Sequence, residues 1–402
     1  MKIVLVENIH NAGIELLKAR GFDDITLIKD SPKEQDLIDI LQTADAIGIR
    51  TRTKLTKEIL QNVKKVRAIG CACIGTDQVD LEFAGNIGLP VFNAPFGNTR
   101  SVAELTIGEM IMLARKVPDK FVKMQNGIWD KSLQGCFEIK GKTIGIIGYG
   151  HIGSQVGVLA EALSMNVIYY DIERKQNFGG AKPSNSLEEL LKKSDVVTIH
   201  VPNLPSTKDM IGKKEFALMK KGAIFLNLAR GNVVDFDALA NAIESEHLMG
   251  CAVDAYKVEP KNKDEEFVNV LRKFKSNVIL TPHIGGLTEE AQIAMAVDMT
   301  EKMANFLQYG NTNGAVNFPE INASYKPNID RILHIHKNIP GVMMELNKIF
   351  GEIGLNIESQ HLNTKNNIGY GVIDTKKESI NAQVIDKLNA VKGTIKVIKS
   401  IM

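Results

Sequence analysis

The chain has 402 residues, which is long enough for two or three domains with separate hydrophobic cores. Charged residues make up 24% of it and the formal net charge is only +2, so no basic field indicates a nucleic acid or membrane surface as partner. No apolar run reaches the roughly 20 residues that cross a bilayer. The four cysteines form no Cys-x-x-Cys pair, which predicts a reduced cytoplasmic protein without a metal site.

Short apolar strands alternate with amphipathic helices in the first two thirds of the chain, a pattern typical of parallel, doubly wound sheets. The strands fall into two sets, which predict two Rossmann-like α/β domains. The first set comprises residues 2–6, 25–28, 46–50, 66–69 and 91–93, and the second comprises residues 143–147, 166–170, 196–200, 223–227, 249–253 and 277–280.

Two long helices are expected to connect these sets. The run Ser101–Val102–Ala103–Glu104 fits a capping box that opens a helix ending near Lys116. A second helix, at about 288–308, is expected to return to the first domain and make it discontinuous. We therefore predict a substrate-binding domain at 1–98 and 287–318, and a nucleotide-binding domain at 99–286.

The last 70 or so residues change pattern to strand, helix, strand, strand, helix, strand. The expected elements are residues 332–336, 341–350, 356–363, 369–374, 380–390 and 394–401. That order is the ferredoxin-like βαββαβ arrangement. It predicts a separate small domain at 329–402, after a linker rich in Asn and Pro.

A glycine pattern follows the strand at 143–147 and precedes a helix. Gly148, Gly150 and Gly153 stand at the three positions of Gly-x-Gly-x-x-Gly. The first glycine permits a tight turn, the second lets the backbone approach a pyrophosphate, and the third lets the helix pack on the strand. Because a helix N-terminus also offers unpaired N–H groups to an anion, the segment predicts a dinucleotide site.

Asp171 closes the next strand at the spacing expected for a partner of the adenosine ribose. A carboxylate there accepts hydrogen bonds from the ribose hydroxyls and repels a 2′-phosphate, which favours NAD over NADP. Arg174 lies three residues further on and weakens that preference.

Three polar residues follow strands of the nucleotide domain, where α/β sheets place their ligands. Arg230 suits the carboxylate of a 2-hydroxy acid, since a guanidinium binds it through two parallel hydrogen bonds. His283 suits the role of the base that accepts the hydroxyl proton, because the ordinary pKa of imidazole is near 6.5. Glu259 can orient the imidazole and stabilise its charged form. Each also has an ordinary interpretation, as a surface ion pair, a loop acid or a helix-approach residue.

With these residues in view, the chain resembles the D-2-hydroxyacid dehydrogenase family over essentially its whole length. Within it, the resemblance is to the short bacterial-type phosphoglycerate dehydrogenases that end in an ACT regulatory domain. The motifs that carry it are Ile146–Gly153, Ala229–Gly231, Thr281–Gly286 and the run His-Ile-His-Lys-Asn-Ile-Pro-Gly at 334–341.

The resemblance implies roles for particular residues. It implies a catalytic triad of Arg230, Glu259 and His283. It implies NAD as cofactor, with contacts from Gly148, Gly150, His151, Ile152, Gly153, Asp171, Leu228, Ala229, Arg230, Asp254, His283, Ile284, Gly285 and Gly286. Substrate contacts are expected at Arg50, Thr51, Arg52 and Asn98, with Lys131 as an addition, and the phosphate is placed near Arg50 and Arg52.

The resemblance also implies feedback by L-serine, bound through His336, Asn338 and Asn356 in the ACT domain. Imidazole and amide groups can satisfy an amino acid without adding a competing charge. Taken from the residues alone, the same side chains could simply cap strand and helix ends. A homotetramer is the expected assembly.

The function expected is NAD-dependent oxidation of 3-phosphoglycerate to 3-phosphohydroxypyruvate, the first committed step of serine synthesis. A relaxed family member could also reduce 2-oxoglutarate to 2-hydroxyglutarate. Two alternatives stay open: a dehydrogenase of another D-2-hydroxy acid, and an NAD-sensing corepressor. The paired arginines and the sensor domain argue against glycerate, lactate and the corepressor.

Overall fold

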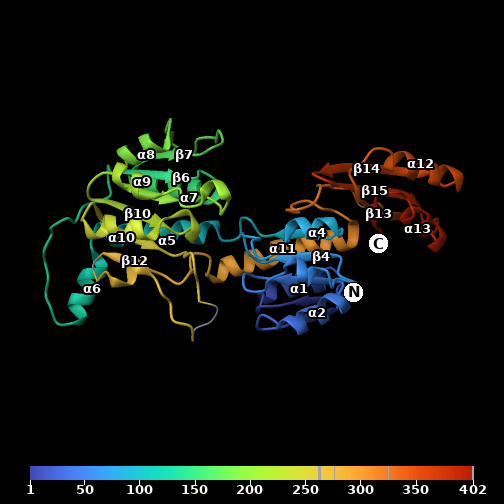
Figure 1. Ribbon diagram of the computed structural model, residues 1–402, viewed down its shortest axis with the longest axis horizontal. Helices are drawn as coiled ribbons and strands as arrows, with labels where there is room; N and C mark the ends of the chain where they lie inside the picture. The colour runs from blue at the N-terminus through green and yellow to red at the C-terminus, as the bar shows by residue number, and fades with distance from the viewer. Residues whose placement is uncertain (261–263, 276, 325, 401–402) are drawn as a thin grey trace. The chain divides into compact units, whose positions relative to one another are not determined.

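The computed structural model describes residues 1–260, 264–275, 277–324 and 326–400 (Figure 1). The chain divides into two compact units, which we treat separately. The central unit is Asn98–Ala291, and the discontinuous unit is Met1–Gly97 together with Gln292–Met402. The predicted division into three domains remains a prediction, and Ile401, the last residue of the expected final strand, lies outside the described residues.

A five-stranded parallel sheet forms the first part of the discontinuous unit, in the order β2-β1-β3-β4-β5. Its strands are β1 (Lys2–Leu5), β2 (Asp24–Leu27), β3 (Ala46–Ile49), β4 (Ala68–Cys71) and β5 (Val91–Asn93). The helices are α1 (Asn11–Ala19), α2 (Glu34–Thr43), α3 (Lys57–Leu60), α4 (Leu81–Asn86) and, spanning the boundary of the units, α11 (Glu289–Tyr309). Strands β3, β4 and β5 are buried along their whole length, because helices cover a parallel sheet on both faces.

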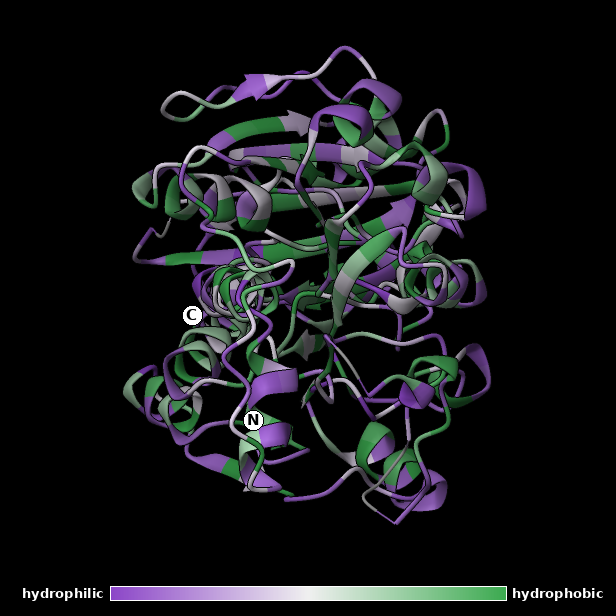
Figure 2. Ribbon diagram, turned by 90° about the vertical axis from the view of Figure 1, so that its left-hand side faces the viewer, coloured by the Kyte–Doolittle hydropathy of each residue, from purple (hydrophilic) through white to green (hydrophobic). Residues whose placement is uncertain are grey.

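The central unit is built on a seven-stranded parallel sheet in the order β12-β11-β10-β9-β6-β7-β8. Its strands are β6 (Thr143–Ile147), β7 (Asn166–Tyr170), β8 (Lys182–Pro183), β9 (Val196–Ile199), β10 (Ala223–Asn227), β11 (Leu248–Val253) and β12 (Val278–Leu280). Alternate residues face two separate cores: Ile146 and Leu226 belong to one, Ile147 and Phe225 to the other. In Figure 2 the strands are largely in the hydrophobic colour while helices alternate between the two colours, as amphipathic helices do.

The helices of this unit are α5 (Thr99–Ala114), α6 (Val117–Gln125), α7 (His151–Ala162), α8 (Leu187–Lys193), α9 (Lys213–Leu218) and α10 (Phe236–Glu244), with short 3-10 turns at Pro205–Thr207, Gly231–Val233 and Val270–Lys273. The predicted capping box at Ser101 is wrong. The N-cap of helix α5 is Asn98, three residues earlier than predicted. The Ser101 hydroxyl instead lies 2.7 Å from that of Thr288, a tertiary contact that the local pattern did not contain.

The C-terminal part of the chain is an antiparallel sheet in the order β14-β15-β13-β16 with two helices. Its elements are β13 (Ile329–Lys337), α12 (Val342–Glu352), β14 (Ile357–Lys365), β15 (Ile368–Lys376), α13 (Ala382–Asn389) and β16 (Thr394–Lys399). The helices close a core that includes Leu346, Phe350 and Leu388. The element order is the predicted one, and the observed strands of the central pair are longer than predicted.

Within the described ranges, no helix is both long and apolar enough to cross a membrane. Among the same residues, no group of three or more His, Cys, Asp or Glu side chains is arranged to hold a metal ion. None of the four cysteines, all of them in the described ranges, forms a disulfide, and Cys71 and Cys73 are buried in the core of the discontinuous unit. Cys71 packs there as a small apolar side chain, whereas Cys73 Sγ lies 3.1 Å from the Gly75 carbonyl oxygen.

Candidate active site and effector region

The glycine turn after β6 forms a helix N-terminus without a side-chain cap. Gly148 has a φ of +87°, and a Cβ on it would lie 2.6 Å from the carbonyl oxygen of His200. A Cβ on Gly153 would lie 2.1 Å from the Gly148 carbonyl oxygen, so only glycine lets α7 pack this closely on the turn. Gly150 is the N-cap of α7 and meets no atom within 4 Å at its Cβ position. No side chain caps the start of α7, so the positive end of the helix dipole suits an anion such as a pyrophosphate.

Asp171 follows β7 and lies beside the same turn. Its carboxylate accepts a hydrogen bond of 2.8 Å from the Tyr149 N–H and one of 3.0 Å from the Glu173 N–H. It also lines a cavity of about 730 Å³ formed by Tyr169, Asp171, Ile172, Glu173, Arg174, Lys175, Gln176, Asn177, Pro183 and Ser184. The turn and this cavity adjoin one another, which suits the pyrophosphate and adenosine ribose of a dinucleotide.

His283 and Glu259 form a hydrogen-bonded pair beyond the ends of β12 and β11. His283 Nδ1 lies 2.9 Å from Glu259 Oε1 and 3.0 Å from Oε2. This hydrogen bond raises the pKa of His283 above its usual value, and the negative charge of Glu259 adds to the effect. Burial alone would raise the pKa of Glu259, but His283 and the Tyr256 N–H lower it. The imidazole is thus held through Nδ1, which leaves Nε2 to exchange a proton.

Arg230 lies close enough to influence both members of this pair. Its positive charge lowers the pKa of Glu259 and opposes the rise in that of His283. The guanidinium donates a hydrogen bond of 2.8 Å to the Ala229 carbonyl. A cation, a base and its acidic partner are thus gathered at the carboxyl ends of neighbouring parallel strands, where such sheets bind their ligands.

Asp254, predicted to contact the cofactor, is only 1% exposed and is occupied by the segment that carries His283. One carboxylate oxygen accepts hydrogen bonds from the Thr281 hydroxyl at 2.6 Å and the Ile284 N–H at 2.8 Å, and the other accepts the Gly285 N–H at 2.8 Å. His283 has a φ of +56°, a conformation uncommon outside glycine. In this structure Asp254 therefore holds the backbone that places His283, and its contact with a cofactor stays a prediction.

Glu109 belongs to the same region and was missed by the sequence reasoning. It is 3% exposed on α5, and neither of its carboxyl oxygens has a hydrogen-bond partner of good geometry among the described residues. Burial and the nearby charge of Asp254 raise its pKa to about 8, and the Thr281 hydroxyl partly offsets this. The available signal was the helical spacing that puts Glu109 on the same side of α5 as the buried Val102 and Leu113. A single acid at such a position is not by itself evidence that the side chain is buried.

The predicted phosphate contacts lie in the discontinuous unit, directly after β3. Thr51 and Arg52 are exposed and Arg50 is half-buried. Lys131 lies elsewhere, in an exposed segment of the central unit, with its Nζ 6.0 Å from the centre of the Trp129 ring. The Oδ1 atom of Asn98, at the start of α5, is buried without a hydrogen-bond partner in the described chain.

The three predicted effector residues do not meet within one chain. His336 is 3% exposed within β13, and its Nδ1 lies 3.1 Å from Nδ1 of His334. Asn338 follows the last residue of β13, whereas Asn356 precedes the first residue of β14, and both are exposed. Strands β13 and β14 both pair antiparallel with β15, so they run in the same direction. Asn338 and Asn356 therefore lie at opposite ends of the sheet, about 30 Å apart along the strands at ~3.3 Å per residue.

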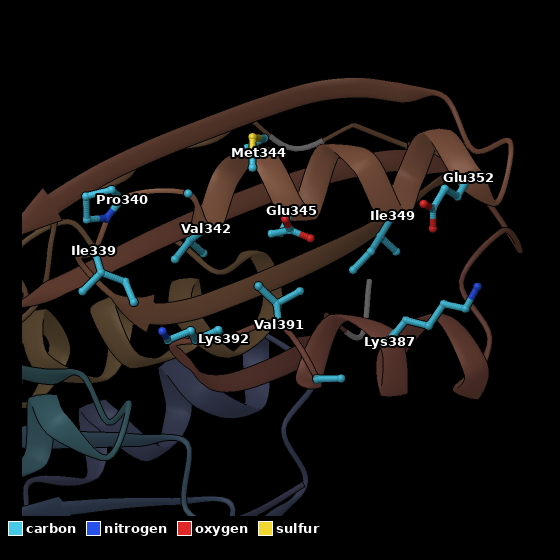
Figure 3. A pocket seen from close by; sticks show the side chains of 12 residues that line it. Ile339, Pro340, Val342, Met344, Glu345, Ile349, Glu352, Lys387, Val391 and Lys392 are labelled. Carbon is cyan, nitrogen blue, oxygen red and sulfur yellow. The ribbon is translucent and has the colours of Figure 1, made fainter.

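A separate groove of about 610 Å³ lies between α12 and α13 (Figure 3). It is lined by Ile339, Pro340, Gly341, Val342, Met344, Glu345, Ile349, Glu352, Lys387, Ala390, Val391 and Lys392. None of the predicted effector residues lines it, although Ile339 directly follows Asn338. The groove is therefore not the site that the sequence predicted.

Two regions of the chain match known protein families. Residues 107–285 match the NAD-binding domain of the D-isomer specific 2-hydroxyacid dehydrogenases. Residues 332–396 match the ACT domain of the acetohydroxyacid synthase small-subunit type. The first match contains the glycine turn, Asp171 and the His283–Glu259 pair, and the second contains the antiparallel sheet.

Relatives align over nearly the whole chain. A D-3-phosphoglycerate dehydrogenase of Escherichia coli K12 is 46% identical over 98% of this chain and 96% of its own length. D-3-phosphoglycerate dehydrogenase 2 of Saccharomyces cerevisiae is 42% identical over 99% of this chain and 87% of its own length. The solved structure of an Aquifex aeolicus D-lactate dehydrogenase with NAD and lactic acid is 26% identical, with a TM-score of 0.67 over 76% of this chain and 95% of that one.

Fold, site geometry and family match together define an NAD-dependent D-isomer specific 2-hydroxyacid dehydrogenase that carries a C-terminal ACT domain. Parallel strands place the glycine turn, the Asp171 carboxylate and the His283–Glu259 pair at the carboxyl ends of the central sheet. Within this class, the chain belongs to the D-3-phosphoglycerate dehydrogenase family.

Proposed function

We propose that the protein oxidises 3-phosphoglycerate to 3-phosphohydroxypyruvate with NAD, the first committed step of L-serine synthesis. The observation that carries the proposal is the His283–Glu259 pair at 2.9 Å, next to Arg230 and on the same sheet as the nucleotide turn. The names of the family members support the substrate.

The triad residues divide the work on the substrate. Arg230 binds the substrate carboxylate through its guanidinium and so fixes the hydroxyl-bearing carbon. His283 accepts the hydroxyl proton at Nε2, while Glu259 holds Nδ1 and stabilises the imidazolium that forms. NAD, when bound, supplies the acceptor for the hydride from that carbon.

The chain's own groups determine how NAD is held. The N-terminus of α7 binds the pyrophosphate, with contacts from His151 and Ile152. Asp171 accepts the ribose hydroxyls and disfavours a 2′-phosphate. The remaining predicted NAD contacts are Leu228, Ala229, Arg230, the 283–286 segment and Asp254, which is assigned to the nicotinamide carboxamide.

Arg50 and Arg52, together with Thr51, bind the substrate phosphate. Their position directly after a parallel strand of the discontinuous unit and their two guanidinium groups support this role. Asn98 and Lys131 are assigned as further substrate contacts. This assignment goes with a substrate-binding domain at 1–98 and 287–318, a NAD-binding domain at 99–286 and a regulatory domain at 329–402.

L-Serine is the proposed effector of the ACT domain. Because Asn338 and Asn356 lie at opposite ends of one sheet, a single serine can contact both only if two copies of the chain contribute to one site. The expected homotetramer supplies such copies. The cytoplasm is the expected location of the protein. Serine acts by binding the active and inactive arrangements unequally.

The test is NADH oxidation by the full-length protein with 3-phosphohydroxypyruvate, in the presence and absence of serine. The proposal expects turnover that serine lowers. Parallel assays with 2-oxoglutarate, hydroxypyruvate and pyruvate separate the phosphorylated substrate from other keto acids. Pyruvate or hydroxypyruvate as the best substrate would instead identify a dehydrogenase of an unphosphorylated acid.

A further inference from the structure

A buried carboxylate organises the segment that carries Arg50 and Arg52. Glu7 is 2% exposed and lies just beyond the end of β1. Parallel pairing of β1 with β3 sets Leu5 opposite Gly48, so Glu7 is level with Arg50 where both strands have ended. Its φ of +59° is uncommon for a residue with a side chain, which indicates that surrounding contacts maintain the conformation.

The Glu7 carboxylate accepts three backbone hydrogen bonds from the segment 50–53. Oε1 accepts the N–H of Arg50 at 3.2 Å and that of Thr53 at 2.8 Å. Oε2 accepts the N–H of Arg52 at 2.9 Å, and the Arg52 Nε lies 3.6 Å from the same oxygen. The carboxylate thus takes the place that an anionic ligand occupies in a backbone anion-binding turn.

Gln78 holds the same segment from its carbonyl side. Its side-chain N–H donates to the Arg50 carbonyl at 2.6 Å. The Thr53 hydroxyl is fixed in turn, 2.9 Å from that of Ser31. Because internal side chains occupy these backbone groups, the guanidinium groups of Arg50 and Arg52 are left as the main means of binding a phosphate.

We propose that Glu7 is a positioning residue for phosphate recognition, which sets the direction of Arg50 and Arg52 by holding their backbone. The inference rests on the proposed function of these two arginines. Burial alone would raise the pKa of Glu7, but the N–H donors lower it below its usual value, so the group stays ionised. Its negative charge by itself would repel a substrate phosphate.

Because Glu7 is negatively charged, the two possible roles predict opposite changes in KM. If Glu7 acted only through its charge, Glu7→Gln would remove a repulsion and lower KM for 3-phosphohydroxypyruvate. If it acts by position, the amide N–H₂ would face backbone donors, the segment would turn, and KM would rise. We expect a rise of about 10- to 100-fold with kcat within about threefold, because one buried donor loses its acceptor while the chemistry is untouched.

The matched control is Asp45→Asn. Asp45 is also buried and accepts a backbone N–H, that of Lys2 at 2.7 Å, but it lies just before β3, at the opposite end from Arg50. The readouts are KM and kcat for phosphohydroxypyruvate and hydroxypyruvate, inhibition by inorganic phosphate, and the thermal unfolding midpoint. Glu7→Gln should weaken phosphate inhibition and leave hydroxypyruvate kinetics unchanged, whereas Asp45→Asn should do neither.

A second variant keeps the proposal testable if Glu7→Gln does not fold. Gln78→Met, close in size, removes the amide donor to the Arg50 carbonyl and to Cys73 Sγ but leaves Glu7 in place. It should raise KM for the phosphorylated substrate in the same direction by a smaller factor. A fall in KM, an unchanged KM, or equal losses on both substrates would overturn the role of Glu7. Arg50→Ala tests the underlying assignment separately: equal losses on both substrates there would remove the phosphate site itself.

Discussion

Histidines in two regions of the molecule show opposite acid–base behaviour. In the central unit, Glu259 raises the pKa of His283, whose side chain is about half exposed. In the ACT region, burial lowers the pKa of His334 to about 3, and the neighbouring His336 adds to this effect. The pKa of His336 is lowered as well, again mainly by burial.

The difference comes from the partner each imidazole has. A carboxylate at 2.9 Å favours the charged form, whereas a second imidazole at 3.1 Å can only share one proton between two Nδ1 atoms. His334 also meets the Thr394 hydroxyl through Nε2 at 3.0 Å, which fixes the other side of the ring. The central unit thus provides a group suited to proton transfer, and the ACT region a neutral polar contact suited to structure.

The largest expected effect concerns the histidine beside Glu259. His283→Asn should lower kcat by ~10²–10⁴ while leaving NADH binding nearly intact, since it removes the base without touching the nucleotide turn. Steady-state kinetics and calorimetry with NADH measure the two. The control is His247→Asn, since His247 Nε2 lies 3.0 Å from the Phe216 carbonyl oxygen and has no proposed chemistry. Near-normal turnover in His283→Asn would show that His283 is not the base, and the central unit would then have no histidine with a role in proton transfer.

The effector site gives the next effect. Asn338→Ala or Asn356→Ala should weaken serine inhibition by about 10- to 100-fold, because each removes hydrogen bonds to a charged ligand. Asn389→Ala, at the exposed end of α13, should change nothing. Co-expressed single variants sharpen the comparison: mixed oligomers should recover part of the inhibition if two chains complete one site. No recovery at all would favour a site made within one chain.

The third prediction uses the low pKa of His334. The unfolded chain binds a proton below pH 6.5 and the folded chain does so only near pH 3, so stability is lost as the pH falls through this interval. At pH 5 the loss from this residue should be about 2 kcal/mol, at ~1.4 kcal/mol per pH unit. Chemical denaturation at pH 7 and pH 5 measures it, with His334→Asn expected to reduce the difference. The exposed His361→Asn should not, and equal slopes in all three proteins would contradict the prediction.

The smallest effect is a change in the pH–rate profile. Glu259→Gln keeps the shape of the side chain but removes the charge that raises the pKa of His283, so the apparent pKa for oxidation should move lower. The folded-state pKa of wild-type His283 is raised, so its small stabilising contribution is present at low pH and lost as the pH rises through that value. An unmoved profile would show that Glu259 does not influence the base.

Strands and the nucleotide turn could be predicted because their signals are local. Buried parallel strands consist of short apolar runs, and the spacing of Gly148, Gly150 and Gly153 reflects steric limits within one turn. The two-residue strand β8 was not predicted, since Lys182–Pro183 has neither length nor alternation. The predicted start of α5 was wrong because the Ser101 hydroxyl does not cap the helix. Its partner is the Thr288 hydroxyl, 187 residues away, which no local pattern contains.

The candidate site was predictable in its residue types and less so in its supporting contacts. Arg230, Glu259 and His283 stand at strand ends, so the order of elements was enough to single them out. Glu7 and Glu109 were missed because an acid in a sequence does not indicate whether it is buried. The opposite placement of Asn338 and Asn356 depends on strand direction, which no motif contains.

The sequence alone determined the order of elements, the positions of the glycines and the residues that follow each strand. These features depend on the steric and hydrophobic preferences of residues that are neighbours in the chain. Only the tertiary structure decided the protonation of the two buried glutamates. Glu7 and Glu109 are almost equally inaccessible, yet three N–H donors lower the pKa of one, and the lack of such donors beside a second acid leaves the other raised to about 8. Burial penalises the charge in both places, and only the folded chain determines which donors are present to offset it.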